Sequence, residues 1–104
     1  MTIQFNTDNN ITGGEEFKAP LIALIADDLS RFSDQITRVE VHLSDENSNK
    51  NGLNDKRCLM EGRLQGRQPI AVTNLADTEE QAVSGAIDKL KASLETILGR
   101  LRNR

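Results

Sequence analysis

Near the carboxyl end of the chain, seven apolar residues recur at the spacing of a single helical face. They are Val83, Ile87, Leu90, Leu94, Ile97, Leu98 and Leu101. Asp77 or Thr78 can cap the start of this helix, and acidic residues follow in the first turn, where the helix dipole favours anions. A helix cannot bury such a stripe alone, so a second apolar layer must cover it. The sequence therefore predicts a long amphipathic helix packed on another element.

A shorter stripe predicts a second helix in the first third of the chain. After Phe17, apolar residues fall at Leu21, Leu24, Ile25, Leu29 and Phe32. We place Pro20 in the first turn or at a kink, because a helix interior loses a hydrogen bond at proline. The pair Ser33-Asp34 should close this helix.

Four segments show the patterns of strands. The residues that carry these patterns are Ile3 and Phe5; Val39, Val41 and Leu43; Cys58, Met60 and Leu64; and Ile70 to Thr73. Gly62 is a weak or bulged position within the third strand. Gly66-Arg67-Gln68 predicts the turn into the fourth strand. The polar run 44–55 is too polar to bury and predicts a mobile hairpin loop.

The order of these elements predicts a single α+β domain over residues 1–104. It reads β-α-β-β-β-α, which fits a four-stranded mixed sheet with both helices on one face. The first strand needs a parallel partner, because its connection crosses over through a helix, whereas the hairpin strands run antiparallel. The other face should be wet, with Gln4, Arg38, Glu40, His42, Arg57, Glu61, Arg63 and Thr73 on it.

The two halves of the chain carry opposite charge. Residues 1–55 hold four bases against ten acids, a net charge of −6, and residues 56–104 hold nine bases against six acids, a net charge of +3. Any polyanion should therefore meet the second half.

Basic residues frame the stripe of the final helix. On a helical wheel Lys89, Arg100 and Arg104 lie on one side, and Lys91 and Arg102 lie on the other. We predict that these five residues bind RNA, with Arg57, Arg63 and Arg67 as an extension of the patch. Two other readings stay open. Cations in the last turn also complement the helix dipole, and the strand arginines can instead pair with Glu40 and Glu61.

Catalytic and metal-binding patterns are missing from the sequence. His42 is the one histidine, and beside Glu40 it could suggest acid–base chemistry, but a base needs an oriented partner and a pocket. The single Cys58 excludes an internal disulfide and a multi-cysteine metal site. We therefore expect no catalytic residue, no metal, no cofactor and no small-molecule substrate. Because no apolar run could cross a bilayer and no leader precedes the first strand, we expect a cytoplasmic protein with no membrane partner.

Several segments resemble the family of ribosome hibernation-promoting factors and ribosome-associated inhibitors, also called ribosomal subunit interface proteins. Val83-Ser-Gly-Ala-Ile-Asp88 resembles the family signature Ala-Ala-Ile-Asp. Asn9-Asn10-Ile-Thr12, Leu29-Ser-Arg-Phe32 and Ile36-Thr-Arg-Val-Glu-Val41 also look like family positions, so the resemblance covers nearly the whole chain.

That resemblance implies a fold like that of double-stranded-RNA-binding domains. It also implies a ribosome-binding factor that occupies the small-subunit decoding channel, contacts 16S rRNA and silences translation under stress. Long family members carry an extra dimerisation domain after the final helix, and this sequence ends with that helix. We therefore expect a monomer.

Some positions depart from the family pattern. Ser93 and Thr96 stand where family members often have a base, and Asp27 and Asp28 lie in a region that is commonly basic. The alternative hypothesis is therefore a protein-interaction module that keeps the fold and no longer binds ribosomes.

Overall fold

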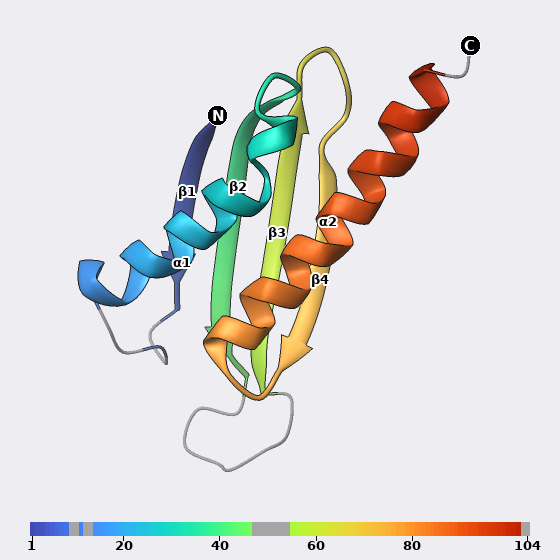
Figure 1. Cartoon of the computed structure of the whole chain (residues 1–104). Coiled ribbons are helices and arrows are strands. Elements are labelled where there is room, and N and C mark those ends of the chain that lie inside the picture. The colour runs from blue at the N-terminus through green and yellow to red at the C-terminus, as the bar shows by residue number, and fades with distance from the viewer. Residues whose placement is uncertain (9–10, 12–13, 47–54, 103–104) are drawn as a thin grey trace.

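The computed structural model describes residues 1–8, 11, 14–46 and 55–102, and of residues 100–102 the backbone alone. In chain order its elements are β1 (Thr2–Thr7), α1 (Glu15–Asp28), the 3₁₀ helix η1 (Ser30–Phe32), β2 (Ile36–Asp45), β3 (Lys56–Leu64), β4 (Ile70–Ala76) and α2 (Glu79–Arg102). The predicted order β-α-β-β-β-α is confirmed (Figure 1).

The four strands form one mixed sheet in the order β1-β2-β3-β4. The outer strand β1 runs parallel to β2, and the two hairpin pairs β2–β3 and β3–β4 are antiparallel. This is the predicted topology, because the crossover through α1 returns the chain in the same direction.

Gly62 lies where α2 approaches the sheet closely. It pairs in register with Val39 and Ile70, and the irregularity in the ladder falls between Ile36 and Arg38, so the structure shows no bulge at Gly62. A Cβ at this position would lie 3.3 Å from Cδ1 of Leu90, a tight contact. The absence of a side chain at Gly62 therefore allows α2 to pack closely against β3.

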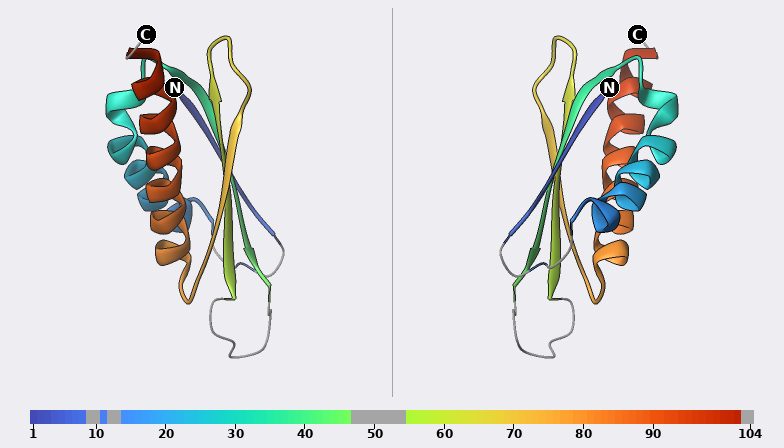
Figure 2. Two further views of the ribbon diagram at one scale, coloured as in Figure 1. Left: turned by 90° about the vertical axis from the view of Figure 1, so that its right-hand side faces the viewer. Right: turned by 90° about the vertical axis from the view of Figure 1, so that its left-hand side faces the viewer.

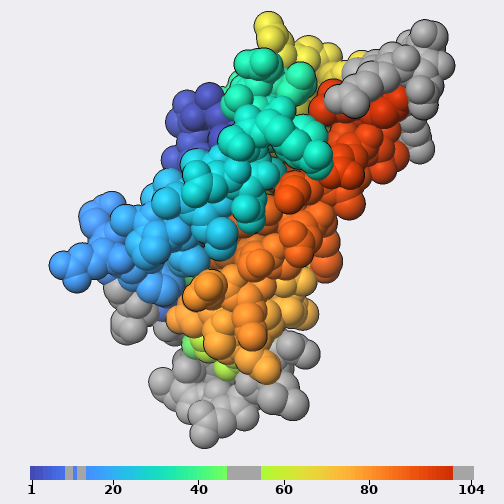
Figure 3. Space-filling view, in the orientation of Figure 1, coloured from blue at the N-terminus to red at the C-terminus, as the bar shows by residue number. Residues whose placement is uncertain are grey.

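Both helices cover the same face of the sheet, as predicted (Figure 2). Helix α1 crosses over β1 and β2, while α2 runs diagonally over β3 and β4 (Figure 1). The two helices cover this face side by side (Figure 3). The core between the layers is aliphatic, and its largest fully buried side chains include Ile25, Leu29, Val39, Val41, Leu43, Met60, Ile87, Leu90 and Leu94.

The first helix begins earlier than predicted. Because α1 starts at Glu15, Pro20 lies inside the helix in its second turn, and the placement in the first turn is wrong. Proline has no N–H for the Glu16 carbonyl, so the helix tolerates one missing hydrogen bond on its exposed side. Toward its end the predicted helix divides into α1 and η1, and Ser33 follows η1 as its cap.

The predicted polar loop 44–55 is wrong at both of its ends. Strand β2 continues through Asp45, and Asp45 and Asp55 are each only 8% exposed. Lys56 Nζ lies 3.2 Å from Asp45 Oδ2 and 3.1 Å from Asp55 Oδ1, which offsets the cost of burying these carboxylates. The hydrogen bond to Asp55 is the main cause that raises the pKa of Lys56. Residues 47–54, which include most of the loop, lie outside the described residues.

Candidate nucleic-acid interface

Helix α2 has two flanks, separated by the buried seam of Val83, Ile87, Leu90 and Leu94. One flank faces β4 and the other faces α1 (Figure 1). Helical periodicity places Lys89, Ser93 and Thr96 on the first flank and Lys91, Glu95 and Leu98 on the second. We call them the β4 flank and the α1 flank.

On the β4 flank, Lys89 is attached to the edge strand. Its Nζ donates a 2.7 Å hydrogen bond to the carbonyl oxygen of Thr73. An ammonium group has three donors, so two remain for an anion. Because the partner is a neutral carbonyl, the charge of Lys89 is not compensated at this contact.

Two adjoining hollows separate α2 from β4 and the β3–β4 turn. One has a volume of about 380 Å³ and is lined by Ile70, Ala92, Ser93, Thr96 and Ile97. The other has a volume of about 410 Å³ and is lined by Leu64, Gly66, Arg67, Gln68 and Ile97. Since Ile97 lines both, we treat them as one surface, the β4 groove. Its floor is apolar, its rim carries hydroxyl, amide and guanidinium groups, and no carboxylate is among these lining residues.

Arg67 supplies a cation at the turn end of the β4 groove. It follows Gly66, whose φ of 71° lies in the left-handed region that favours glycine in a turn. Arg67 is exposed and forms no ion pair with any residue in the described part of the chain. Arg67 therefore lines one end of a groove whose described lining residues include no carboxylate, and Lys89 lies one helical turn before Ser93 at the other end.

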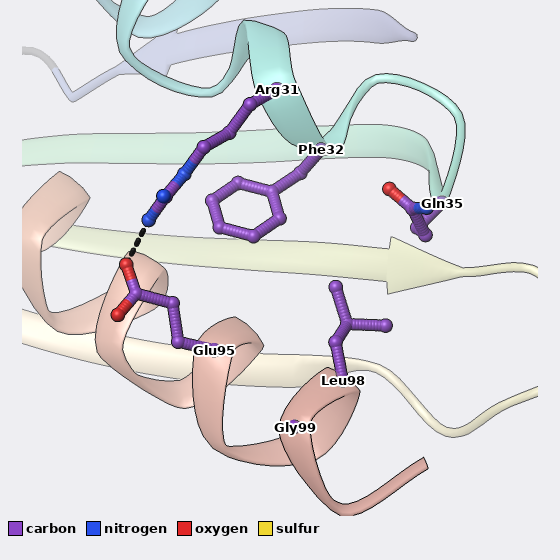
Figure 4. A pocket seen from close by; sticks show the side chains of 6 residues that line it. All are labelled: Arg31, Phe32, Gln35, Glu95, Leu98 and Gly99. Carbon is purple, nitrogen blue, oxygen red and sulfur yellow. Dashed lines mark hydrogen bonds and ion pairs between the residues drawn. The ribbon is translucent and has the colours of Figure 1, made fainter. Parts of the chain in front are cut away.

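The α1 flank differs in charge, because the cation and the carboxylate of its hollow pair with each other. A hollow of about 380 Å³ is lined there by Arg31, Phe32, Gln35, Glu95, Leu98 and Gly99 (Figure 4). Arg31 pairs with Glu95, and its guanidinium carbon lies 4.6 Å from the centre of the Phe32 ring. Asp34 lines an adjoining hollow with Leu98 and Arg67, so Arg67 borders both this hollow and the β4 groove. Lys91 lies one helical turn before Glu95, so carboxylates accompany the cations of this flank.

The strand arginines lie on the face of the sheet opposite the helices, so they do not extend the row on α2. Arg63 Nη2 lies 3.1 Å from Glu61 Oε1 and 4.0 Å from Glu40 Oε2, which confirms the alternative that it pairs with these two acids. For Arg57 that pairing is wrong, because its Nε lies 3.7 Å from Glu46 Oε1. Arg57 is four residues from Glu61, roughly 13 Å along the strand, beyond reach of the Glu40–Glu61 pair.

The last three predicted arginines are described only in part. The backbone of α2 continues through Arg100 and Arg102, whereas their side chains and all of Arg104 lie outside the described residues. The periodicity that places Lys89 on the β4 flank also places position 100 there, and position 102 falls on the α1 flank. Their contact with RNA stays a prediction.

The described residues form no group of three or more histidine, cysteine, aspartate or glutamate side chains that could hold a metal ion. His42 is exposed on the open face of β2. Burial raises the pKa of the Cys58 thiol to about 12, so Cys58 is a protonated packing residue. None of the described helices has the length and apolar character required to cross a membrane.

Sequence reasoning missed the β4 groove as a surface. It treated Ser93 and Thr96 as positions that had lost a base, although their spacing from Lys89 puts all three on one flank. That spacing is the signal that could have found the helical side of the groove. Ile70 and Gln68 join it only through the tertiary fold, so no local pattern identifies them.

No family model and no curated protein matches the sequence. Solved structures match the fold closely. The crystal structure of the Thermus thermophilus Protein Y N-terminal domain superposes with a TM-score of 0.71 at 18% identity, covering 93% of this chain and 99% of that one. A ribosomal subunit interface protein from Coxiella burnetii superposes with a TM-score of 0.70 at 19% identity, covering 95% and 99%. These likenesses confirm the expected fold.

Proposed function

We propose that the protein is a non-enzymatic, cytoplasmic, monomeric factor that binds the small ribosomal subunit and silences translation under stress. In this proposal α2 contacts 16S rRNA in the decoding channel through its β4 flank. The fold is shared with a protein named for the ribosomal subunit interface. The observation that carries the proposal is the groove without carboxylates between Lys89 and Arg67.

The placement of charge supports binding of a polyanion despite the net charge of −3. Phosphates that replace their counterions with protein cations release those counterions, which favours binding at low salt. Binding of this kind depends on the local potential of the docking surface more than on total charge. RNA is therefore expected to approach the β4 side, where Arg67 lines the groove and Lys89 lies one helical turn before Ser93, and to avoid Glu95 and Asp34.

Co-sedimentation with purified small subunits tests this proposal. The double variant Lys89→Gln/Arg67→Gln removes two charges from the β4 side, and the matched control Lys91→Gln/Lys18→Gln removes two charges elsewhere. The first variant should bind at least about tenfold more weakly, and its dependence of log K on log salt should be shallower by roughly one for each lost phosphate contact. Equal losses in both variants, or no binding by the wild-type chain at low salt, would contradict the proposal.

Translation in a reconstituted system tests the silencing step. The wild-type chain should lower the yield of a reporter protein in proportion to small-subunit occupancy, and the Lys89→Gln/Arg67→Gln variant should do so less. Binding without any loss of reporter yield would remove silencing from the proposal and leave ribosome binding.

The acidic first half of the chain favours a second candidate, a protein-interaction module with the same fold. Asp27 is exposed at the end of α1, and Arg31 at η1 is already paired with Glu95. This candidate predicts a protein partner whose binding survives high salt and is insensitive to Lys89 and Arg67.

A further inference from the structure

The β4 groove combines two chemistries that a phosphate chain alone does not need. Arg67 lines one end and Lys89 lies one helical turn before Ser93 at the other, but between them the floor is formed by Ile70, Ile97 and Leu64. Ile70 and Ile97 are half-buried, so both present apolar surface to the groove. Phosphates gain nothing from an apolar floor, whereas every nucleobase has a flat apolar face.

The polar rim adds hydrogen-bonding groups of both kinds. Thr96 Oγ1 donates its proton to the carbonyl oxygen of Ala92 at 3.0 Å, so toward a ligand this oxygen acts as an acceptor. Ser93 can donate or accept, and the amide of Gln68 can do both. Exocyclic amines and ring nitrogens of a base need such a mixed set of partners.

A base reaches this floor only when it leaves its stack. The paired bases of an A-form duplex cover each other's faces and present edges and backbone to a protein. The volumes of about 380 and 410 Å³ lie within the range of about 300–1,000 Å³ typical of small-ligand pockets. The hollow on the α1 flank is as large, but its cation Arg31 is already paired with Glu95 and is less available to the phosphates that carry the base.

We infer that the β4 groove accepts an unpaired RNA nucleobase, with its flanking phosphates on Lys89 and Arg67. The protein then recognises single-stranded or bulged RNA and discriminates against a regular duplex. This inference rests on the proposed function and specifies which form of rRNA the site binds.

Fluorescence anisotropy with labelled RNA tests the inference on the full chain. The probes are a 12-nucleotide single strand of mixed sequence and the same strand annealed to its complement. The variant Ser93→Leu fills the groove without changing charge, and Ser93→Ala is its matched control. Ser93→Leu should weaken single-strand binding about tenfold, the effect of losing one base contact, whereas Ser93→Ala should change it less than about threefold. The salt dependence should stay the same, because no phosphate contact is lost.

Thr96→Leu is a second variant that fills the groove, and it tests the inference even if Ser93→Leu does not fold. Thr96 is exposed, so this change leaves the core intact, and the same loss of single-strand affinity is expected. Equal affinity for single strand and duplex, or wild-type affinity in both filling variants, would overturn the inference. So would a groove that binds a second copy of the chain, detected as a dimer by sedimentation equilibrium that Ser93→Leu dissociates.

The outcomes separate this inference from the proposed function. If small-subunit binding depends on Lys89 and Arg67 while filling the groove has no effect, the base site fails and ribosome binding stands. If the small subunit does not bind at all, the proposed function fails, whatever the oligonucleotides show.

Discussion

The two flanks of α2 differ in chemistry although they belong to the same helix. Each borders a hollow of about 380 Å³, and each carries a lysine at nearly the same height, Lys89 on one side and Lys91 on the other. No carboxylate is among the described residues that line the β4 groove, whereas Glu95 lines the hollow of the α1 flank and Asp34 lines a hollow between the two, which Leu98 and Arg67 both border. From this difference we expect the position of the acids, more than the number of bases, to decide where a polyanion binds.

The flanks also differ in the kind of polar contact that attaches them to the neighbouring elements. On the β4 side the contacts are made to backbone carbonyls: Lys89 bonds to Thr73, and Asn74 Nδ2 donates to Gln81 and Ala82. On the α1 side the contact is an ion pair between Arg31 and Glu95. A carbonyl holds a cation without neutralising it, so the β4 flank is attached to the sheet and still keeps its positive charge.

The largest effect is expected in the seam between the flanks. Leu90 is fully buried and lies over Gly62, which has no side chain to fill a void. Leu90→Ala should therefore lower the free energy of unfolding by about 3–5 kcal/mol, the upper part of the range for such changes. The control Leu98→Ala, at a partly buried residue beside the α1 hollow, should cost about 1–2 kcal/mol because less contact is lost. Urea denaturation measures both, and equal costs would mean that α2 is packed equally tightly along its length.

The next largest effect is expected when a negative charge is added to one flank or the other. Thr96→Glu adds one negative charge to the β4 flank and should weaken small-subunit binding about tenfold, or about 1.4 kcal/mol. Lys91→Glu changes the charge of the α1 flank by two units and should weaken binding less than about threefold. If total charge decided affinity, the lysine variant would be the weaker binder. Co-sedimentation at a single low salt concentration distinguishes the two results.

The fold could be predicted from the sequence because its signals are local. The stripe that contains Leu90 and Leu94 repeats at helical spacing, and Val39 and Val41 alternate at strand spacing, so each element identifies its own buried side. The mispredicted burial of Asp45 depends on a partner eleven positions away in the sequence. Asp45 and Asp55 read as loop residues by composition, and only Lys56, brought between them by the β2–β3 hairpin, makes their burial possible.

The candidate site could be predicted only in part for the same reason. A helical wheel separates Lys89 from Lys91, but it cannot show that one faces the edge strand and the other faces Arg31 and Glu95. Alternation along β3 places Arg57 and Arg63 on the wet face, and the predicted topology already places that face away from the helices, so these two arginines could not extend the row on α2. Arg67 joins Lys89 because the β3–β4 turn lies next to Ile97.

A smaller effect tests the backbone attachment of the β4 flank. Asn74 donates 3.3 and 3.2 Å hydrogen bonds to the carbonyls of Gln81 and Ala82, in space left open by Gly85, where a Cβ would lie 2.1 Å from Asn74 Nδ2. These carbonyls also belong to the ladder of α2, so Asn74→Ala should lower the unfolding free energy by only about 1 kcal/mol. Thr73→Ala, an exposed change at the next residue, is the control and should cost less than about 0.5 kcal/mol. Thermal denaturation that ranks the two variants in the opposite order would contradict the attachment.

The smallest effect is expected for the ion pair on the α1 flank. The side chains of Arg31 and Glu95 are 59% and 55% exposed, so solvent screens their attraction. In a double-mutant cycle with Arg31→Ala and Glu95→Ala, the coupling should be about 0.5 kcal/mol or less and should fall further at high salt. A coupling above about 2 kcal/mol would show that η1 and α2 are clamped together by charge. In that case the ion pair, in addition to the shared core, would hold η1 against α2. The two flanks would then differ in the strength of their contacts as well as in their charge.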